Sequence, residues 1–534
     1  MRNSIKSLLH NLKENANRFD VVSLETKFKC LKDLSKMSLP VNRDLITYFE
    51  ILLFIIAYPA DSKQLFLAEK ELMRISRYLK TNRKSQSKLF ENSGMPFTST
   101  VTRFSHDGVR WLLAHPHCNT DLNSFETPIL QLNEVLRLTL TSVEKSETTA
   151  GLGNIALMNT LLVAEKNRLR FIIDELSRLD HLPYVKDHFY DRLELFVRVT
   201  PNDKLFSKAY NRLDFTSPFF NHELLKKFEI KDVLNKALPA YAEMSEGERE
   251  ISVIKNSMAV TGRETDPTTF MEERSLRLYH LERGISVAIY SMIPSRQLPL
   301  ESYIGFTSFK NGFPVAYGGA WVFGERANFG INIFESFRNG ESAFIMAQLL
   351  RVYRHVFNLC YFEVEPYQFG LDNPEGIASG AFWFYYRLGF RSLDKILGQK
   401  ANEEHEKILT KKGYRTSHKT LIRFTASSIG LKLSRSVPPA VVDITSRVTR
   451  MIQHMYNGDR ILAETDCRTK FLLKTKIKAT HGENQNQVLT EVALWAEAMN
   501  IKKTHQLDLL AQMITTKPDD VYAYQDLVIS FFKD

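Results

Sequence analysis

Turn signals between aromatic and β-branched runs constrain the fold of this chain most. In "ESYIGFTSFKNGFPVAYGGAWVFGERANFGINIFESF" (301–337), Asn311-Gly312 is a pair that readily adopts the positive φ angles of a tight hairpin turn, and "GERA" at 324–327 supplies a second turn. The runs beside these turns have the length and composition of strands. The sequence therefore predicts three antiparallel strands, at about 301–309, 314–323 and 328–337.

Helices and strands alternate after this meander. The pattern predicts a helix at about 342–357, a short strand "CYFEVEP" at 360–366 and a second helix within "SGAFWFYYRLGF" at 379–390. The run before the meander, "TTFMEERSLRLYHLERGISVAIYSMI" (268–293), also has apolar spacing that predicts a helix. Strands followed by alternating helix and strand indicate an α+β fold with a central mixed sheet flanked by helices.

The rest of the chain has helical periodicity. With 534 residues the chain is too long for one ordinary core. Segments such as "SKQLFLAEKELMRISRYL" (62–79) and "QVLTEVALWAEAMN" (487–500) place apolar residues on one helix face. We expect a mainly helical region over 1–260, a sheet domain over 261–397 and a helical C-terminal region over 398–534, with no linker composition between them.

The sequence has only weak signals for export, for membrane insertion and for disulfide bonding. The N-terminus "MRNSIKSLLHNLKENANRF" has no continuous apolar centre, and the longest apolar run, 51–57, is far shorter than the roughly 20 residues of a membrane span. The four cysteines are scattered without a CxxC pair. We therefore expect a buried helix at 51–57, no transmembrane segment and a cytoplasmic location.

The charge of the chain and its potential metal ligands indicate which partners it could bind. The formal net charge is +10, and basic residues gather at 77–88, 409–419 and 470–478, which suits anionic partners such as phosphates, CoA-type cofactors, nucleic acid or a membrane surface. The alternative is that these segments are solvated helix faces or loops, as most charge runs are. In "AHPHC", His115, His117 and Cys118 lie too close together for a common metal site, and no second cluster completes four ligands. No metal is expected.

The turn between the last meander strand and the following helix is the first candidate site. A helix that begins after such a turn directs unpaired backbone N–H groups outward, where the macrodipole attracts an anion. Gly340 would allow close approach of a ligand, Ser342 can cap the helix, and Arg338 can neutralise a phosphate. The alternative is a capped helix start with an exposed arginine. The candidate cofactor-binding residues of this turn are Arg338, Asn339, Gly340, Glu341, Ser342 and Ala343.

The order of these elements resembles the GNAT superfamily of acyl-CoA-dependent N-acyltransferases over about 265–395. The most specific part is the family pattern A-x-x-x-Y-x-[KR]-x-G-F, which Ala381, Tyr385, Arg387, Gly389 and Phe390 match. The resemblance implies a GNAT-like sheet domain, acetyl-CoA or another acyl-CoA as co-substrate, and a general-acid role for Tyr385 toward the departing thiolate.

Two positions depart from the family pattern. The phosphate loop is usually [QR]-x-x-G-x-[GA]; with Gly340 as its glycine, Phe337 stands in the cation position and Ser342 in the last small position. The family asparagine stands three residues before the helix alanine, where this chain has Ala378. Asn373, eight residues before that alanine in the longer loop "FGLDNPEGIASG", is the candidate to replace it.

Acyl transfer to an amine also requires a base. In "YFEVEP" the alternation of a strand places Phe362 and Val364 on one face and Glu363 and Glu365 on the other. Glu335, at the end of the preceding strand, is the third candidate. Each can instead be a surface carboxylate paired with a neighbouring cation.

Three functions follow from these features. The first is an acyl-CoA-dependent N-acyltransferase that acts on a small-molecule or peptide amine. The second is a transferase of the same fold that uses a large anionic donor such as aminoacyl-tRNA, which would suit the basic charge. The third is a catalytically silent GNAT-like module within a helical binding protein.

Overall fold

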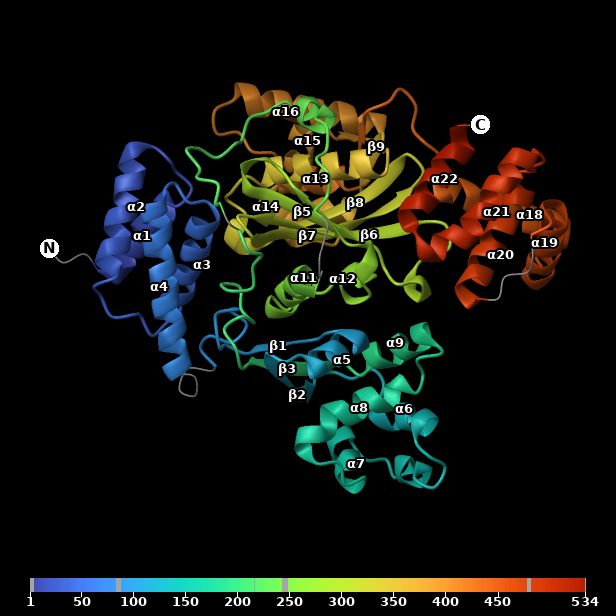
Figure 1. The fold of residues 1–534 in the computed structure, drawn as a ribbon, viewed down its shortest axis with the longest axis horizontal. Helices are drawn as coiled ribbons and strands as arrows, with labels where there is room; N and C mark the ends of the chain where they lie inside the picture. Colours follow the sequence, from blue (N-terminus) through green and yellow to red (C-terminus); the bar gives the residue numbers. More distant parts are fainter. Residues whose placement is uncertain (1–3, 83–87, 216, 243–247, 478–481, 534) are drawn as a thin grey trace. The chain divides into compact units, whose positions relative to one another are not determined.

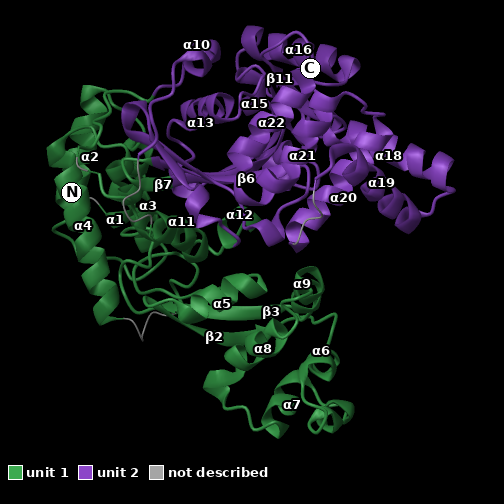
Figure 2. Ribbon diagram, turned by 45° about the vertical axis from the view of Figure 1, so that its right-hand side comes forward, with its two compact units in different colours: residues 1–224, 246–269, 310–314 green, residues 225–245, 270–309, 315–534 purple. Residues whose placement is uncertain are grey.

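The computed structural model describes residues 4–82, 88–215, 217–242, 248–477 and 482–533. The chain divides into two compact units, shown in separate colours in Figure 2. Unit 1 comprises residues 1–224, 246–269 and 310–314, and unit 2 comprises residues 225–245, 270–309 and 315–534. Two of the basic segments lie partly outside the described residues, at 83–87 and 478.

Unit 1 begins with four helices: α1 (Ile5–Asn15), α2 (Val21–Leu34), α3 (Asp44–Ala57) and α4 (Ser62–Thr81). Every residue of α3 from Ile51 to Ala57 is buried, which confirms the buried helix expected there. Asp61 caps α4 by accepting a hydrogen bond from the Gln64 backbone N–H. In the described ranges, no helix combines the length and apolar content of a membrane span.

The second part of unit 1 contains a small sheet that the sequence did not predict. Its strand order is β1 (Thr100–Thr102), β3 (Leu195–Pro201), β2 (Cys118–Phe125), and both pairings are antiparallel. The remaining helices of unit 1 are α5 (His106–Ala114), α6 (Leu132–Thr139), α7 (Asn154–Thr160), α8 (Arg168–Ser177), α9 (Pro183–Arg192), α11 (Glu248–Val260) and α12 (Asp266–Thr269).

Unit 2 is built on an eight-stranded sheet with the order β10-β11-β9-β8-β7-β6-β5-β4. Three of its strands, β6 (Ser302–Lys310), β7 (Phe313–Phe323) and β8 (Arg326–Ile333), are the predicted meander. Asn311 and Gly312 have φ angles of 46° and 81°, which confirms the positive-φ turn between the first two. The other strands are β4 (Arg277–His280), β5 (Ile285–Tyr290), β9 (Tyr361–Val364), β10 (Arg391–Ser392) and β11 (Ile429–Lys432).

Helix α13 (Ser342–Val356) packs on one face of this sheet (Figure 1). Its Tyr353 ring contacts the rings of Phe306 and Phe329, and its hydroxyl donates to the Ile304 carbonyl at 2.7 Å. The predicted second helix is α15 (Ala381–Arg387), and Gly380, with a φ of 67°, separates it from α14 (Pro374–Ser379). Unit 2 also contains α10 (Ile230–Asn235), α16 (Lys395–Thr410) and α17 (His418–Phe424).

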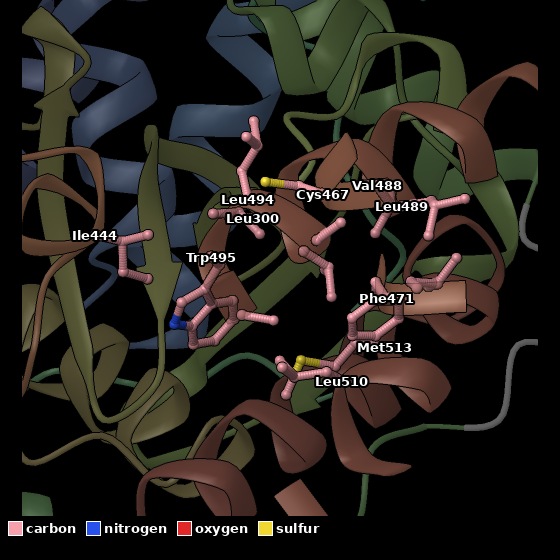
Figure 3. Close-up of a cluster of buried hydrophobic side chains, with 14 of the residues drawn as sticks. Leu300, Ile444, Cys467, Phe471, Val488, Leu489, Leu494, Trp495, Leu510 and Met513 are labelled. Atoms are coloured by element: carbon pink, nitrogen blue, oxygen red, sulfur yellow. The ribbon is translucent and has the colours of Figure 1, made fainter. Parts of the chain in front are cut away.

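Five C-terminal helices of unit 2 enclose a second apolar core (Figure 3). Trp495 is fully buried in it, and its indole contacts the rings of Phe323 on β7 and of Phe531. Because Phe323 and Leu300 belong to this cluster, the helices share a core with the end of the sheet. The helices are α18 (Val441–Tyr456), α19 (Arg460–Thr475), α20 (Glu483–Ala498), α21 (Thr504–Asp519) and α22 (Val521–Lys533).

The helix predicted over 268–293 is wrong for most of its length. Residues 277–280 and 285–290 are instead the antiparallel strands β4 and β5. Arg283 and Gly284 have φ angles of 61° and 67° between them, which no helix tolerates. All six residues of β5 are buried, and a strand buried on both faces shows no alternation by which to distinguish it from a buried helix.

Candidate functional site

The parallel strands β8 and β9 part at their carboxyl ends. Their pairing covers three positions, from Arg326↔Tyr361 to Asn328↔Glu363. Strand β8 continues to Ile333, while β9 ends at Val364. The last five residues of β8 therefore have no partner strand on that side among the described residues. In open α/β sheets, ligands bind beside the carboxyl ends of parallel strands, so this opening is the candidate site.

The predicted phosphate turn follows the carboxyl end of β8. A 3-10 turn at Glu335–Phe337 leads into it, and the Gly340 N–H donates to the Phe337 carbonyl at 3.0 Å. The Ser342 hydroxyl donates to the Arg338 carbonyl at 3.3 Å, so it braces the turn rather than capping α13. The Arg338 guanidinium is 46% exposed and pairs with the Glu375 carboxylate. Asn339 is exposed, and Ala343 is half-buried in the first turn of α13.

Glu341, the residue before α13, faces inward. Its side chain is buried, and its carboxylate accepts hydrogen bonds from Arg283 Nε at 2.9 Å and from the Leu225 backbone N–H at 2.8 Å. The guanidinium of Arg283 compensates the buried charge. Glu341 thus holds other segments of unit 2 in place, and the outward side of the turn is left to Arg338 and Asn339.

The two strand glutamates lie on the face predicted for them. Phe362 and Val364 are completely buried, whereas Glu363 is half-buried and Glu365 is exposed. The Glu363 carboxylate pairs with Arg326 at 2.5 Å, and Glu365 Oε1 accepts a hydrogen bond from Asn328 Nδ2 at 2.5 Å. Glu363 is therefore charge-compensated, while Glu365 holds its charge against a neutral amide.

Tyr385 lies on α15 and is 3% exposed. Its ring contacts those of Phe384 and Phe390, and burial raises the pKa of its hydroxyl. A phenol in such surroundings stays protonated at neutral pH, as a proton donor must. Gly389, with a φ of 92°, ends this helix.

Asn373 already has two structural partners. Its Oδ1 accepts from the Gly376 N–H at 3.2 Å as the N-cap of α14, and its Nδ2 donates to the Tyr367 carbonyl at 3.0 Å. Both ends of the amide therefore order the loop that follows β9.

The structure brings some predicted residues together and leaves others apart. Arg338 reaches Glu375, two residues beyond Asn373, and the two strand glutamates bond to neighbouring β8 side chains. Within the described ranges, no hydrogen bond or ion pair joins the side chain of Tyr385 or Glu335 to another of the predicted residues. Glu335 is exposed at the opening of the turn.

The sequence did not single out the aromatic residues beside these glutamates. Trp321 stands opposite Asn328 in the β7–β8 register, and its ring stacks on Tyr303 with centroids 4.4 Å apart. A signal in the sequence is Gly318-Gly319, because glycines inside a strand often mark a close backbone approach. The structure confirms the approach: a Cβ on Gly319 would lie 2.5 Å from Tyr303 Cε2, and one on Gly318 would lie 2.2 Å from the Gly330 oxygen.

The His115–Cys118 segment leads into β2 in unit 1. The His117 backbone N–H donates to His115 Nδ1 at 3.1 Å; burial, and then the neighbouring His117, lower the pKa of His115 to about 4. Burial raises the pKa of Cys118 to about 11. In the part of the chain that the structure describes, no three such side chains form a group able to hold a metal ion.

Neither a family profile, nor a curated protein sequence, nor a solved structure matches this chain.

Proposed function

We propose that the chain is an acyl-CoA-dependent N-acyltransferase whose reaction takes place at the opening between β8 and β9. The observation that supports this proposal is the parting of two parallel strands directly before a turn and helix that carry an exposed arginine. Such an opening allows a thioester to reach the edge of the sheet while its phosphates remain at the turn. The order of elements is the one on which the resemblance to the GNAT superfamily depends.

In this proposal the donor is acetyl-CoA or another acyl-CoA, and the acceptor is an amine. Arg338 would bind a phosphate in place of the Glu375 carboxylate. An exposed ion pair contributes only about 0–1 kcal/mol, so its exchange for a phosphate costs little. The outward side of the turn, from Arg338 to Ala343, remains available because the Glu341 charge is buried against Arg283.

The chemistry divides between two groups. Glu365 would take a proton from the acceptor ammonium, and the neutral nitrogen then attacks the thioester carbonyl. As the new C–N bond forms and the C–S bond breaks, the thiolate would take the Tyr385 proton, and the second proton lost by the new amide nitrogen would restore the Tyr385 phenol through water. This step requires the sulfur to reach a hydroxyl that is buried.

The proposal is tested by following thiol release from acetyl-CoA with a panel of primary amines. We expect amine-dependent thiol release that Tyr385→Phe slows by roughly 10²–10⁴-fold, the usual contribution of a general acid, with unchanged acetyl-CoA affinity. Tyr414→Phe, which removes a half-buried phenol hydroxyl bonded to Glu404 on α16, is the matched control. Equal rates for Tyr385→Phe and the wild type would exclude the acid role, and salt-sensitive tRNA binding without thiol release would favour the tRNA-dependent alternative.

A further inference from the structure

One face of the unit 2 sheet carries a group of polar and aromatic side chains beside the opening between β8 and β9. Helix α13 packs on the face that presents Phe306 and Phe329. Because side chains alternate along a strand, Asn328 projects from the opposite face, as does Trp321, its cross-strand partner. We call this group the Trp321 face; its members are Tyr303, Trp321, Asn328, Glu365 and Gln368.

Two facing glycines create the space for this group. Gly319 and Gly330 are directly opposite each other on β7 and β8. A Cβ on Gly319 would lie 2.5 Å from the Tyr303 ring, and a Cβ on Gly330 would lie 2.8 Å from Gln368 Nε2. The Tyr303 ring and the Gln368 amide thus lie directly on the backbone. The Trp321 ring covers Tyr303, at an interplanar angle of 12°.

Several polar groups of this face have no hydrogen-bond partner among the described residues. Of the groups the structure describes, none hydrogen-bonds the Gln368 side-chain amide or the Trp321 indole N–H. Glu365 uses Oε1 for Asn328, and Oε2 has no bond to the described chain. Trp321, Asn328 and Gln368 are half-buried and Glu365 is exposed, so a ligand can reach them.

Carboxylates gather beside the Trp321 face, although the chain as a whole is basic. The net charge of the protein is +10, yet Glu301, Glu363 and Glu365 lie along this side of the sheet, where Arg326 compensates only Glu363 directly. Burial raises the pKa of Glu301, Arg326 and Lys517 oppose this shift, and the charge of Glu365 adds to it. A cation therefore suits the Trp321 face electrostatically.

We propose that the Trp321 face binds the alkylammonium group of the amine acceptor, against the outer side of the Trp321 ring and the Glu365 carboxylate. This inference rests on the proposed function, since it assigns the substrate class of the same opening. An ammonium over an indole ring gains cation–π attraction, and the adjacent carboxylate supplies the ion pair. The Gln368 side-chain oxygen accepts a hydrogen bond from the ammonium. Glu365 lies two residues beyond the last β8–β9 pair, Asn328↔Glu363, so the bound nitrogen lies beside the opening.

Indole signals provide a direct test. The chain has four tryptophans, so a ¹⁵N–¹H spectrum contains four indole signals, and Trp321→Phe identifies the one from Trp321. The full-length protein is titrated with butylamine, with 1,4-diaminobutane, and with 1-butanol as the uncharged match. The test variant is Glu365→Gln, which removes the charge but keeps an oxygen that can accept the hydrogen bond from Asn328. The matched control is Glu403→Gln, which removes the charge of another exposed carboxylate, on α16.

We expect both amines to shift the Trp321 signal and 1-butanol to leave it unchanged. Glu365→Gln should weaken amine binding about tenfold or more, and Glu403→Gln should bind as the wild type does. An unmoved Trp321 signal, an equal response to 1-butanol, or wild-type affinity in Glu365→Gln would overturn the inference.

A parallel titration of the same samples with acetyl-CoA separates this inference from the proposed function. Acetyl-CoA binding without an amine response overturns the amine site alone. An amine response without acetyl-CoA binding overturns the acyltransferase proposal, and with it the assignment of the amine as acceptor, although the cation site stands.

Discussion

At the scale of single residues, the two charged side chains of the 338–341 turn have opposite environments. Glu341 is buried against Arg283, while Arg338 is half-exposed and paired with an exposed glutamate. The sequence placed both residues in one phosphate cradle, because spacing along a turn does not reveal which side chain points inward. The partners that decide this, Arg283 and Leu225, are distant in the sequence.

The Glu341–Arg283 pair supports the stability of unit 2. Arg283→Met leaves a buried carboxylate without its cation, so we expect the free energy of unfolding to fall by about 3–5 kcal/mol. Glu341→Gln removes the charge and keeps an acceptor for Leu225, and it should cost less. Urea titrations of both single variants and the double variant measure the coupling. Purely additive losses would show that the two side chains do not stabilise each other.

The Arg338–Glu375 pair predicts an unusual gain of affinity. If a phosphate displaces Glu375, then Glu375→Gln removes the competitor and the nearest negative charge. Acetyl-CoA should bind a few-fold more tightly, consistent with the small free energy of an exposed pair. Calorimetry in parallel with Glu406→Gln, an exposed glutamate on α16, provides the comparison. Weaker binding in Glu375→Gln would mean that the pair orders the turn instead.

At the scale of elements, local signals made the central meander predictable. Asn311-Gly312 marks a hairpin by its own backbone preference, and the 342–356 helix has clear 3.6-residue periodicity. Strands β4 and β5 were missed because continuous apolar burial resembles a helix. Strand β11 lies in a region that the sequence predicts to be helical. Its four residues are too few to show a periodic pattern of apolar residues, and long-range pairing decides its place between β9 and β10.

Part of the candidate site was also predictable from the sequence. The alternation along β9 placed Glu363 and Glu365 on their face, and the strand ends located the opening. The Trp321 face was not predictable, because it combines side chains of the neighbouring strands β6, β7 and β8 with Glu365 and Gln368, which follow β9.

Because β7 and β8 pack closely at Gly318, we expect one added methyl group there to reduce the stability of the fold strongly. Gly318→Ala would bring a Cβ within 2.2 Å of the Gly330 oxygen, a backbone atom that cannot turn aside. We expect a loss of about 3 kcal/mol or more, at the upper end of overpacking effects. Gly398→Ala in α16, whose nearest neighbour is 3.9 Å away, should instead stabilise by about 0.5–1 kcal/mol. Thermal melting of both variants distinguishes these outcomes, and similar melting temperatures would refute the packing argument.

At the scale of the whole molecule, the C-terminal helices are part of the unit that contains the site. Lys517 Nζ donates to Ser302 Oγ at 2.5 Å and to the Glu301 carbonyl at 3.0 Å, and the Tyr524 hydroxyl donates to the Leu300 carbonyl at 2.8 Å. These bonds hold the chain where it enters β6. We therefore expect the 265–395 fragment to be unstable alone, and limited proteolysis that released a stable fragment of that size would contradict this.

The buried Lys517 predicts how stability depends on pH. Burial lowers the pKa of Lys517 from 10.5 to about 7, while the unfolded chain keeps the ordinary value. Between these values the unfolded state binds more protons, so stability rises with pH, by up to about 1.4 kcal/mol per unit. The contribution is lost as pH falls toward 7. Lys517→Met should flatten the unfolding free energy between pH 7 and 10, relative to wild type, and an unchanged slope would contradict this assignment.

The most direct test of the acyltransferase proposal is a calorimetric titration of the full-length protein with acetyl-CoA and with CoA. The proposal predicts micromolar binding of both ligands, weakened about tenfold or more in Arg338→Ala by the lost phosphate contact, and unchanged in Arg447→Ala, an exposed arginine on α18. Absence of heat with either ligand in the wild-type protein, or equal affinity in Arg338→Ala, would contradict the proposed cofactor site.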